Sequence, residues 1–90
     1  MGTIEQKVRD VLKMQFADEA IQFDHEPGER VSGFIISERF LDMDHGTRQR
    51  IIWDLLRTHL TREERGQVLG FLTFTRAEER FYAEAREDSD

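Results

Sequence analysis

The sequence predicts an α+β domain in which helices cover one face of a three-stranded sheet. Two observations predict this class. Apolar residues recur at helical spacing in some segments and alternate with a period of two in others. These segments follow one another in the order α-β-β-α-α-β, with a further helix at the end, and helices gathered on one face of a sheet make an α+β sandwich. A chain of 90 residues has room for one such domain, spanning residues 1–90.

The first predicted element is an amphipathic helix over residues 4–16. Thr3 and Gln6 have the spacing of a capping box, in which a hydroxyl and an amide each bond a free backbone N–H at the helix start. The apolar residues of the buried face follow at helical spacing: Ile4, Val8, Val11, Leu12 and Phe16.

A β-hairpin is predicted next, with strands at about residues 21–24 and 31–37. Apolar and polar residues alternate in the first strand, as expected when one face is buried. Pro27 presets the second turn position and Gly28 tolerates the positive φ of the third, which predicts a type II turn. A turn this short makes the two strands antiparallel neighbours.

A second buried helix is predicted over residues 48–59, after a connection at residues 38–46. Asp44 and Thr47 are both able to cap its start, and the sequence leaves that choice open. Trp53 lies at the edge of the apolar face, where a lid over the core is favoured over an interface residue. The apolar face itself is formed by Ile51, Ile52, Leu55, Leu56 and Leu60.

A threonine followed three residues later by a glutamate marks two further helix starts. Thr61 with Glu64 opens a short helix, and Gly66 suits its end. Thr75 with Glu78 opens the terminal helix. The apolar side of that terminal helix is formed by Ala77, Phe81 and Ala85, with Tyr82 beside them.

The last strand is predicted over residues 67–75. Strict alternation places Val68 and Gly70 on one face and Leu69 on the other. A glycine inside a strand indicates a bulge or a close backbone approach. Residues 86–90 are expected to form a frayed tail.

Composition excludes several kinds of function. The chain has 13 basic and 19 acidic residues, a net charge of −6, which disfavours a general nucleic-acid or anionic-membrane binder. The absence of cysteine excludes disulfides, thiolate metal sites and cysteine nucleophiles. No apolar run approaches the ~20 residues of a membrane span, and the charged N-terminal segment is unlike a signal peptide. We therefore expect a cytoplasmic protein.

Three blocks of the chain, in order and at matching intervals, carry a family resemblance. They are IISERF at residues 35–40, RQRIIW at 48–53 and LGFLTFT at 69–75. Together they resemble the BolA-like family, over roughly residues 4–82 of this chain. The resemblance implies a type II KH-like fold with a mixed sheet, in which the third strand pairs parallel with the first. It also implies a non-enzymatic regulatory domain in stress response or transcription regulation, acting through a protein partner.

The partner that this resemblance implies is a monothiol glutaredoxin, with which family members share a [2Fe–2S] cluster. Two positions depart from the family pattern. Gln49 stands where the family has a histidine between two arginines, and Gln67 stands where it has the histidine that ligates the cluster. An amide oxygen is a hard ligand that suits cluster iron poorly. His25 is the one candidate for the second ligand, in the loop between the first strands. A shared cluster is therefore disfavoured.

The three histidines of the chain give no catalytic or metal motif. His25 lies between two carboxylates, but adjacent side chains on a strand point to opposite faces and do not converge on one ion. We therefore expect an exposed loop histidine at this position, with metal ligation as the weaker alternative. No nucleophile motif accompanies the scattered histidines, so the chain is not expected to be an enzyme.

A partner-binding surface is predicted on the second helix and the start of the last strand. Residues 47–66 hold five arginines against three carboxylates in an otherwise acidic chain. Arginine suits bidentate recognition of carboxylate or phosphate. The competing interpretation is a solvated helix face with internal pairs, such as Arg50 with Asp54. The predicted partner-binding residues are Arg48, Gln49, Arg50, Arg57 and Gln67.

The alternative function is a KH-like nucleic-acid-binding module. KH domains hold the nucleic-acid backbone through a Gly-x-x-Gly loop. This chain lacks the motif, since Gly46 is followed three residues later by Gln49. Binding to nucleic acid would weaken steeply with salt, whereas docking of an apolar protein surface would not.

Overall fold

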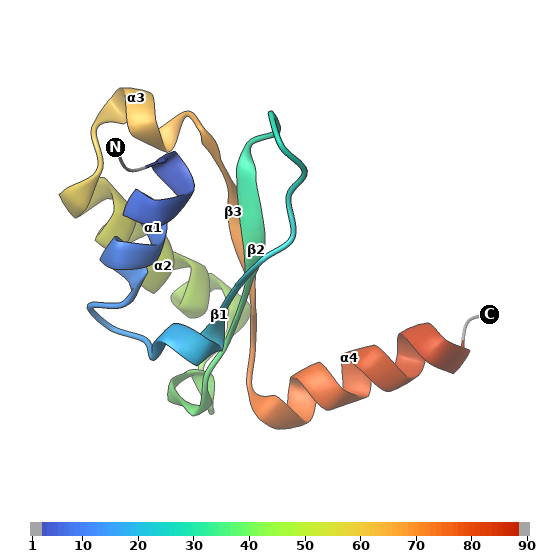
Figure 1. The fold of residues 1–90 in the computed structure, drawn as a ribbon. Coiled ribbons are helices and arrows are strands. Elements are labelled where there is room, and N and C mark those ends of the chain that lie inside the picture. The colour runs from blue at the N-terminus through green and yellow to red at the C-terminus, as the bar shows by residue number, and fades with distance from the viewer. Residues whose placement is uncertain (1–2, 89–90) are drawn as a thin grey trace.

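The computed structural model describes residues 3–88 and confirms the α+β class. Helices α1, α2 and α3 lie on one side of a three-stranded sheet, whereas α4 leaves the end of β3 and runs away from them (Figure 1). In chain order the elements are α1 (Ile4–Leu12), the 3₁₀ helix η1 (Asp18–Ala20), β1 (Ile21–Phe23), β2 (Val31–Ile36), the 3₁₀ helix η2 (Glu38–Phe40), α2 (His45–His59), α3 (Arg62–Arg65), β3 (Val68–Phe74) and α4 (Arg76–Asp88).

The sheet has the strand order β1-β2-β3 and is mixed. The predicted hairpin is confirmed, because β1 pairs antiparallel with β2 and Ile21 lies opposite Ile35. The third strand pairs parallel with β2, with Gly33 opposite Phe71, so the pairing with the first strand that the family resemblance implies is wrong. β2 has intermediate or buried apolar residues on both faces, which suits a central strand.

The core lies between the sheet and the helices α1 and α2, as the two amphipathic patterns predict. The predicted first helix is too long, because α1 ends at Leu12 and residues 13–16 form a turn. Phe16 is nevertheless buried, with its ring centroid 5.3 Å from that of Phe40. Each large apolar side chain buried here contributes about 1.5–3 kcal/mol. The largest fully buried side chains are Phe40, Leu12, Ile35, Ile52, Leu56, Val8 and Val31.

A bulge interrupts the pairing of β2 with β3. Val31 lies opposite Val68 and Ser32 lies opposite Gly70, so Leu69 is an extra residue on β3. Gly70 has a φ of +147°, which a side chain would rarely adopt. The bulge predicted from the glycine is confirmed, but strict alternation was wrong at the start of the strand. Because one residue is inserted, Val68 is buried and Leu69 is 64% exposed.

The predicted turn and helix starts are mostly confirmed. Gly28 has a φ of +88°, and the N–H of Glu29 donates to the carbonyl of Glu26, as a type II turn requires. Asp44, not Thr47, caps α2. The predicted capping box between Thr61 and Glu64 is complete.

One helix start differs from its prediction, and one helix end agrees with it. Thr3 accepts a hydrogen bond from the N–H of Gln6, but the Gln6 amide donates to Asp10, so only half of the first capping box forms. Gly66 ends α3 as predicted, with its backbone in the right-handed region at a φ of −62°.

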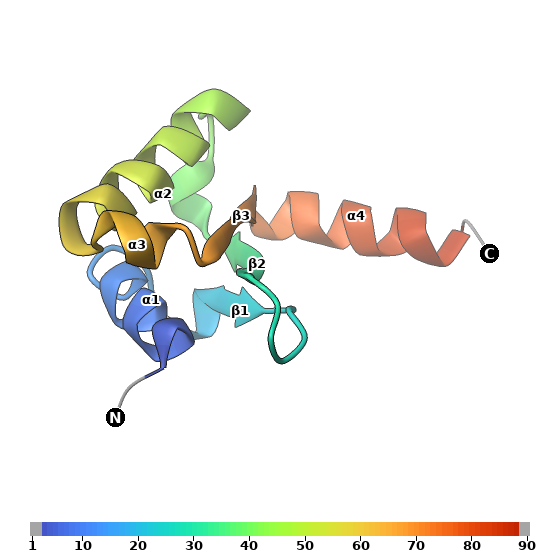
Figure 2. The same ribbon diagram turned by 90° about the horizontal axis from the view of Figure 1, so that it is seen from above.

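Helix α4 projects from the sheet, and the view from above shows most of its length clear of the other elements (Figure 2). Its helical backbone runs to Asp88, through most of the segment expected to be a frayed tail, and residues 89–90 lie outside the described part of the chain. Within that part, no helix is long and apolar enough to cross a membrane.

Candidate protein-interaction surface between α2 and β3

Arg48 of α2 faces the interior of the protein. Asp44 caps the helix by accepting a hydrogen bond of 2.7 Å from the N–H of Thr47, which fixes where α2 begins. From that start, helical spacing places Arg48 on the same face as Ile52 and Leu56, and all three are buried. Only 8% of Arg48 is exposed.

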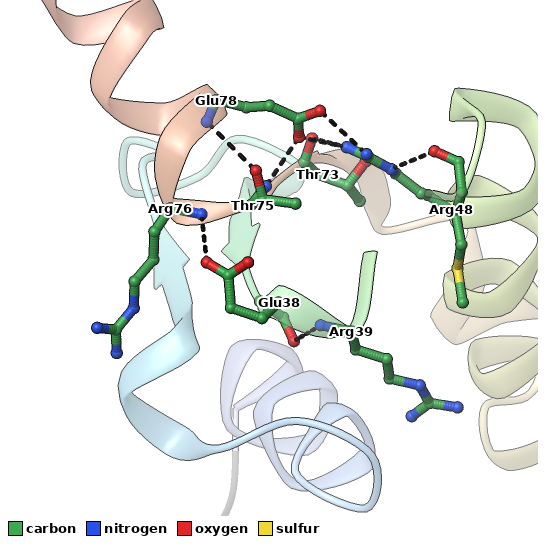
Figure 3. Close-up of polar contacts among 9 residues, drawn as sticks. Glu38, Arg39, Arg48, Thr73, Thr75, Arg76 and Glu78 are labelled. Atoms are coloured by element: carbon green, nitrogen blue, oxygen red, sulfur yellow. Dashed lines mark hydrogen bonds and ion pairs between the residues drawn. The ribbon is translucent and has the colours of Figure 1, made fainter. Parts of the chain in front are cut away.

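The Arg48 guanidinium donates hydrogen bonds to three residues of the same chain (Figure 3). It donates 2.6 Å and 3.0 Å hydrogen bonds to the two carboxylate oxygens of Glu78, on α4. It also donates to the carbonyls of Met43 and Thr73, at 3.0 Å and 3.4 Å. Arg48 thus joins α2 to α4, and most of its N–H donors bind groups of the same chain.

The Glu78 carboxylate is held by Arg48 and by the helix start. The Arg48 hydrogen bonds, then the backbone N–H of Thr75, lower the pKa of Glu78 to about 2. The N–H of Thr75 donates to Glu78 at 2.8 Å, and the N–H of Glu78 donates to the Thr75 hydroxyl at 3.3 Å, so this capping box is complete. Glu38 accepts a 3.0 Å hydrogen bond from the N–H of Arg76 in the same turn (Figure 3).

Gln49 covers part of the outer edge of β3. Its side-chain amide donates a 2.8 Å hydrogen bond to the carbonyl of Phe71, and Arg48 reaches the carbonyl of Thr73 two residues on. β3 is the last strand of the sheet, so these carbonyls have no strand partner. Side chains that bind an edge in this way hinder pairing with another strand.

The remaining three predicted residues lie elsewhere. Arg50 and Arg57 are exposed on the outer face of α2, seven residues apart and therefore on the same side. Asp54 pairs with Arg57, and not with Arg50 as the sequence suggested. Gln67 is exposed beside α1, where it lines a hollow with Lys7 and other residues. The five residues therefore do not form one continuous surface, and their role in binding stays a prediction.

His25 is not the exposed loop histidine that we expected. Its side chain is 12% exposed and lies between β2 and the start of α1. Nδ1 lies 3.3 Å from the carbonyl oxygen of Ser32. Nε2 lies 3.4 Å from the carboxylate of Glu5, and the ring packs edge-on against Phe23. The hairpin loop folds back onto α1, a contact between distant segments that sequence spacing does not reveal.

These residues do not fit the [2Fe–2S] cluster that the resemblance implies. Both nitrogens of His25 face groups of the same chain, and Gln67 offers an amide in place of an imidazole. Among the described residues, no group of three histidine, aspartate or glutamate side chains is arranged to hold a metal ion.

Two exposed leucines lie beside Gln49 at this edge of the sheet. Leu69 is 64% exposed and Leu72 is 49% exposed. They border a hollow of about 420 Å³ that is also lined by Gln49, Trp53 and Gly70. Trp53 packs against the core as predicted, and its ring carbon Cζ2 lies 3.8 Å from the position that a Cβ on Gly70 would take. We call Gln49, Trp53, Leu69, Gly70 and Leu72 the α2/β3 surface.

Sequence reasoning selected the region of the α2/β3 surface but missed its leucines. Strict alternation does not predict which face Leu69 takes, because the bulge inserts a residue next to it. The one feature of the sequence that indicated the bulge was Gly70.

Comparison of the chain with protein-family models, with curated protein sequences and with solved structures finds no match. The BolA-like resemblance therefore rests on the three sequence blocks and on the order of the elements.

Proposed function

We propose that this chain is a non-enzymatic, BolA-like interaction domain that binds a protein partner through the α2/β3 surface. The observation that carries the proposal is the exposure of Leu69 and Leu72 side by side with the half-buried Trp53 and Gln49. Large apolar side chains gathered on an ordered surface are typical of protein-binding sites. The order of elements and the blocks at residues 35–40, 48–53 and 69–75 support the BolA-like part of the proposal.

Burial of the two leucines would favour binding. Complete burial of a leucine side chain contributes about 1.5–3 kcal/mol, and about half of each side chain is still exposed here. Covering both would therefore strengthen binding by about 10- to 100-fold. Gln49 is held by Phe71, so the surface is formed before the partner arrives and little ordering opposes binding.

The partner that the family resemblance implies is a monothiol glutaredoxin. Docking of the cluster-free glutaredoxin needs no imidazole at position 67, so Gln67 does not oppose it. The net charge of −6 disfavours nucleic acid as the occupant, since a polyanion would be repelled by most of the chain.

The test is a titration of the full chain with a cluster-free monothiol glutaredoxin by calorimetry. We expect Leu69→Glu and Leu72→Glu each to weaken binding at least about tenfold, because a charge would enter an apolar contact. Leu41→Glu is the matched control, since Leu41 is 62% exposed but lies outside the α2/β3 surface, and it should bind as the unsubstituted chain does.

Two outcomes would overturn the proposal. The first is the absence of glutaredoxin binding, or binding that the leucine substitutions leave unchanged. The second is binding to duplex or single-stranded nucleic acid that falls steeply between about 50 and 200 mM salt, which would establish the KH-like alternative.

A further inference from the structure

Helix α4 is fastened to the rest of the protein at its first turns. Thr75 and Glu78 form its capping box, and Arg48 and Glu38 bind the same turn (Figure 3). One turn further on, the ring of Tyr82 packs on Phe74 with centroids 5.4 Å apart. Beyond these contacts the helix extends away from the sheet and the other helices (Figures 1 and 2).

The apolar stripe of α4 is left largely uncovered by its own chain. Ala77, Phe81 and Ala85 recur every four residues and line an open hollow beside β3. Phe81 is 74% exposed, the highest value among the large apolar side chains of the described residues. Isolated helices of about this length are marginal in water, and helices in proteins gain most of their stability from packing such a stripe. Packing of another apolar surface on this stripe would therefore stabilise α4.

The chain exposes more surface than a compact monomer of its size. The chain exposes 6345 Å², whereas a folded monomer of 10.7 kDa is expected to expose about 5,500 Å². Its radius of gyration is 13.6 Å against about 12 Å expected for 90 residues. The excess of about 800 Å² equals what one partner contributes to an interface of standard size.

The pattern of α4 is complementary to itself in the antiparallel direction. Phe81 has an alanine one turn before it and another one turn after it, so a phenylalanine from an antiparallel copy has a small residue to pack on. Arg80 and Glu84 lie on one flank of the stripe, one turn apart and opposite in charge. In an antiparallel pair related by a twofold axis, the same flanks meet, so Arg80 of each helix would meet Glu84 of the other.

We propose that this chain forms a twofold-symmetric dimer in which α4 pairs antiparallel with α4 of a second copy. The pairing buries Phe81 of each chain against the alanines of the other and forms two reciprocal Arg80–Glu84 ion pairs. This contact is separate from the α2/β3 surface, so it goes beyond the proposed function and neither depends on the other. A dimer of this kind would present two partner-binding surfaces on one particle.

The first test is sedimentation velocity on the full chain from about 1 µM to 1 mM, a range that covers weak and moderate dimers. We expect a dimer that dissociates on dilution. Phe81→Glu should raise the dimer dissociation constant at least about 30-fold, because it places a charge at the centre of the contact. Leu41→Glu, an equally drastic change outside α4, should leave the constant unchanged.

The second test exchanges the charges between two chains. Arg80→Glu and Glu84→Arg should each weaken the dimer, because like charges would then face each other. An equimolar mixture of the two variants should associate again as a heterodimer, since every facing pair then has opposite charges. An ion pair within one helix would give no such rescue on mixing, so the mixture separates the two explanations.

A monomer at every concentration would overturn this proposal. So would a dimer that survives Phe81→Glu, or a mixture of the charge variants that fails to associate. Circular dichroism of Phe81→Glu checks that the helical content of the monomer is kept, so that loss of the dimer is not loss of the fold.

Discussion

Arg48 and Glu78, thirty residues apart in the chain, join α2 to α4 through two parallel hydrogen bonds of 2.6 Å and 3.0 Å. The same carboxylate closes the capping box with Thr75, so one side chain connects α2, the end of β3 and the start of α4. Arg48 has a buried side chain, whereas Glu78 is half exposed. This pair is one of the contacts that hold the start of α4 against the rest of the protein.

Removal of Arg48 is expected to destabilise the fold. Arg48→Ala leaves Glu78 and the carbonyls of Met43 and Thr73 without their donor, and we expect a loss of about 2 kcal/mol. Arg57→Ala is the control, because its ion pair with Asp54 is exposed and such pairs contribute about 0–0.5 kcal/mol. Urea unfolding of both variants measures the difference, and equal losses would show that the buried pair has no special role.

The same pair makes stability depend on pH in the acid range. The pKa of Glu78 in the folded protein is about 2, below its ordinary value of 4.5, so the contribution is complete above about pH 4.5. It is lost as the pH falls from 4.5 through 2, because protonation removes the negative charge and leaves only one of the two oxygens to accept from Arg48. Glu78 is 46% exposed and screened by solvent, so the effect should be about 1 kcal/mol.

The measurement compares the unsubstituted chain with Glu78→Gln in urea at several pH values. Asp44 and Glu64 also have lowered pKa values, but both are present in the two proteins, so their effects cancel in the difference. The stability difference should shrink between pH 4.5 and pH 2. A difference that stays constant over this range would contradict the assigned role of the carboxylate.

Two glycines are expected to respond in opposite directions to a methyl group. A Cβ on Gly33 would lie 2.0 Å from the carbonyl oxygen of Gln22 on the neighbouring strand, so Gly33→Ala should cost about 3 kcal/mol or more. A Cβ on Gly46 meets no atom closer than 3.8 Å, and Gly46→Ala in α2 should stabilise by about 0.5 kcal/mol. Thermal unfolding of both variants tests this contrast, and a tolerated Gly33→Ala would argue against the pairing of β1 with β2.

Sequence patterns predicted the fold well where local chemistry determines it. The stripe containing Val8 and Leu12 indicated α1, Pro27 and Gly28 indicated the hairpin turn, and Gly70 indicated the bulge. The pairing of β3 with β2 and the folding of the His25 loop onto α1 depend on contacts between distant segments, which periodicity does not reveal.

The candidate site was predicted less completely, for a physical reason. An arginine beside a glutamine on a polar stretch of α2 suggests a solvent-exposed patch, but the start of α2 at Asp44 turns Arg48 inward. Its partner Glu78 lies on an element whose direction the sequence does not specify. The exposure of Leu69 and Leu72 follows from the bulge in β3. Gly70 indicated that a bulge was present, but it did not indicate which side chains of β3 the bulge would expose.

The most direct test of the proposed function is an amide chemical-shift map of the ¹⁵N-labelled chain during titration with a cluster-free monothiol glutaredoxin. The proposal predicts that the largest shifts fall on the α2/β3 surface, at Gln49, Trp53, Leu69 and Leu72. The amide chemical shift of Leu41, a leucine of matching exposure, should not change. Shifts confined to Arg50 and Arg57 on the outer face of α2, or to the loop around His25, would contradict it.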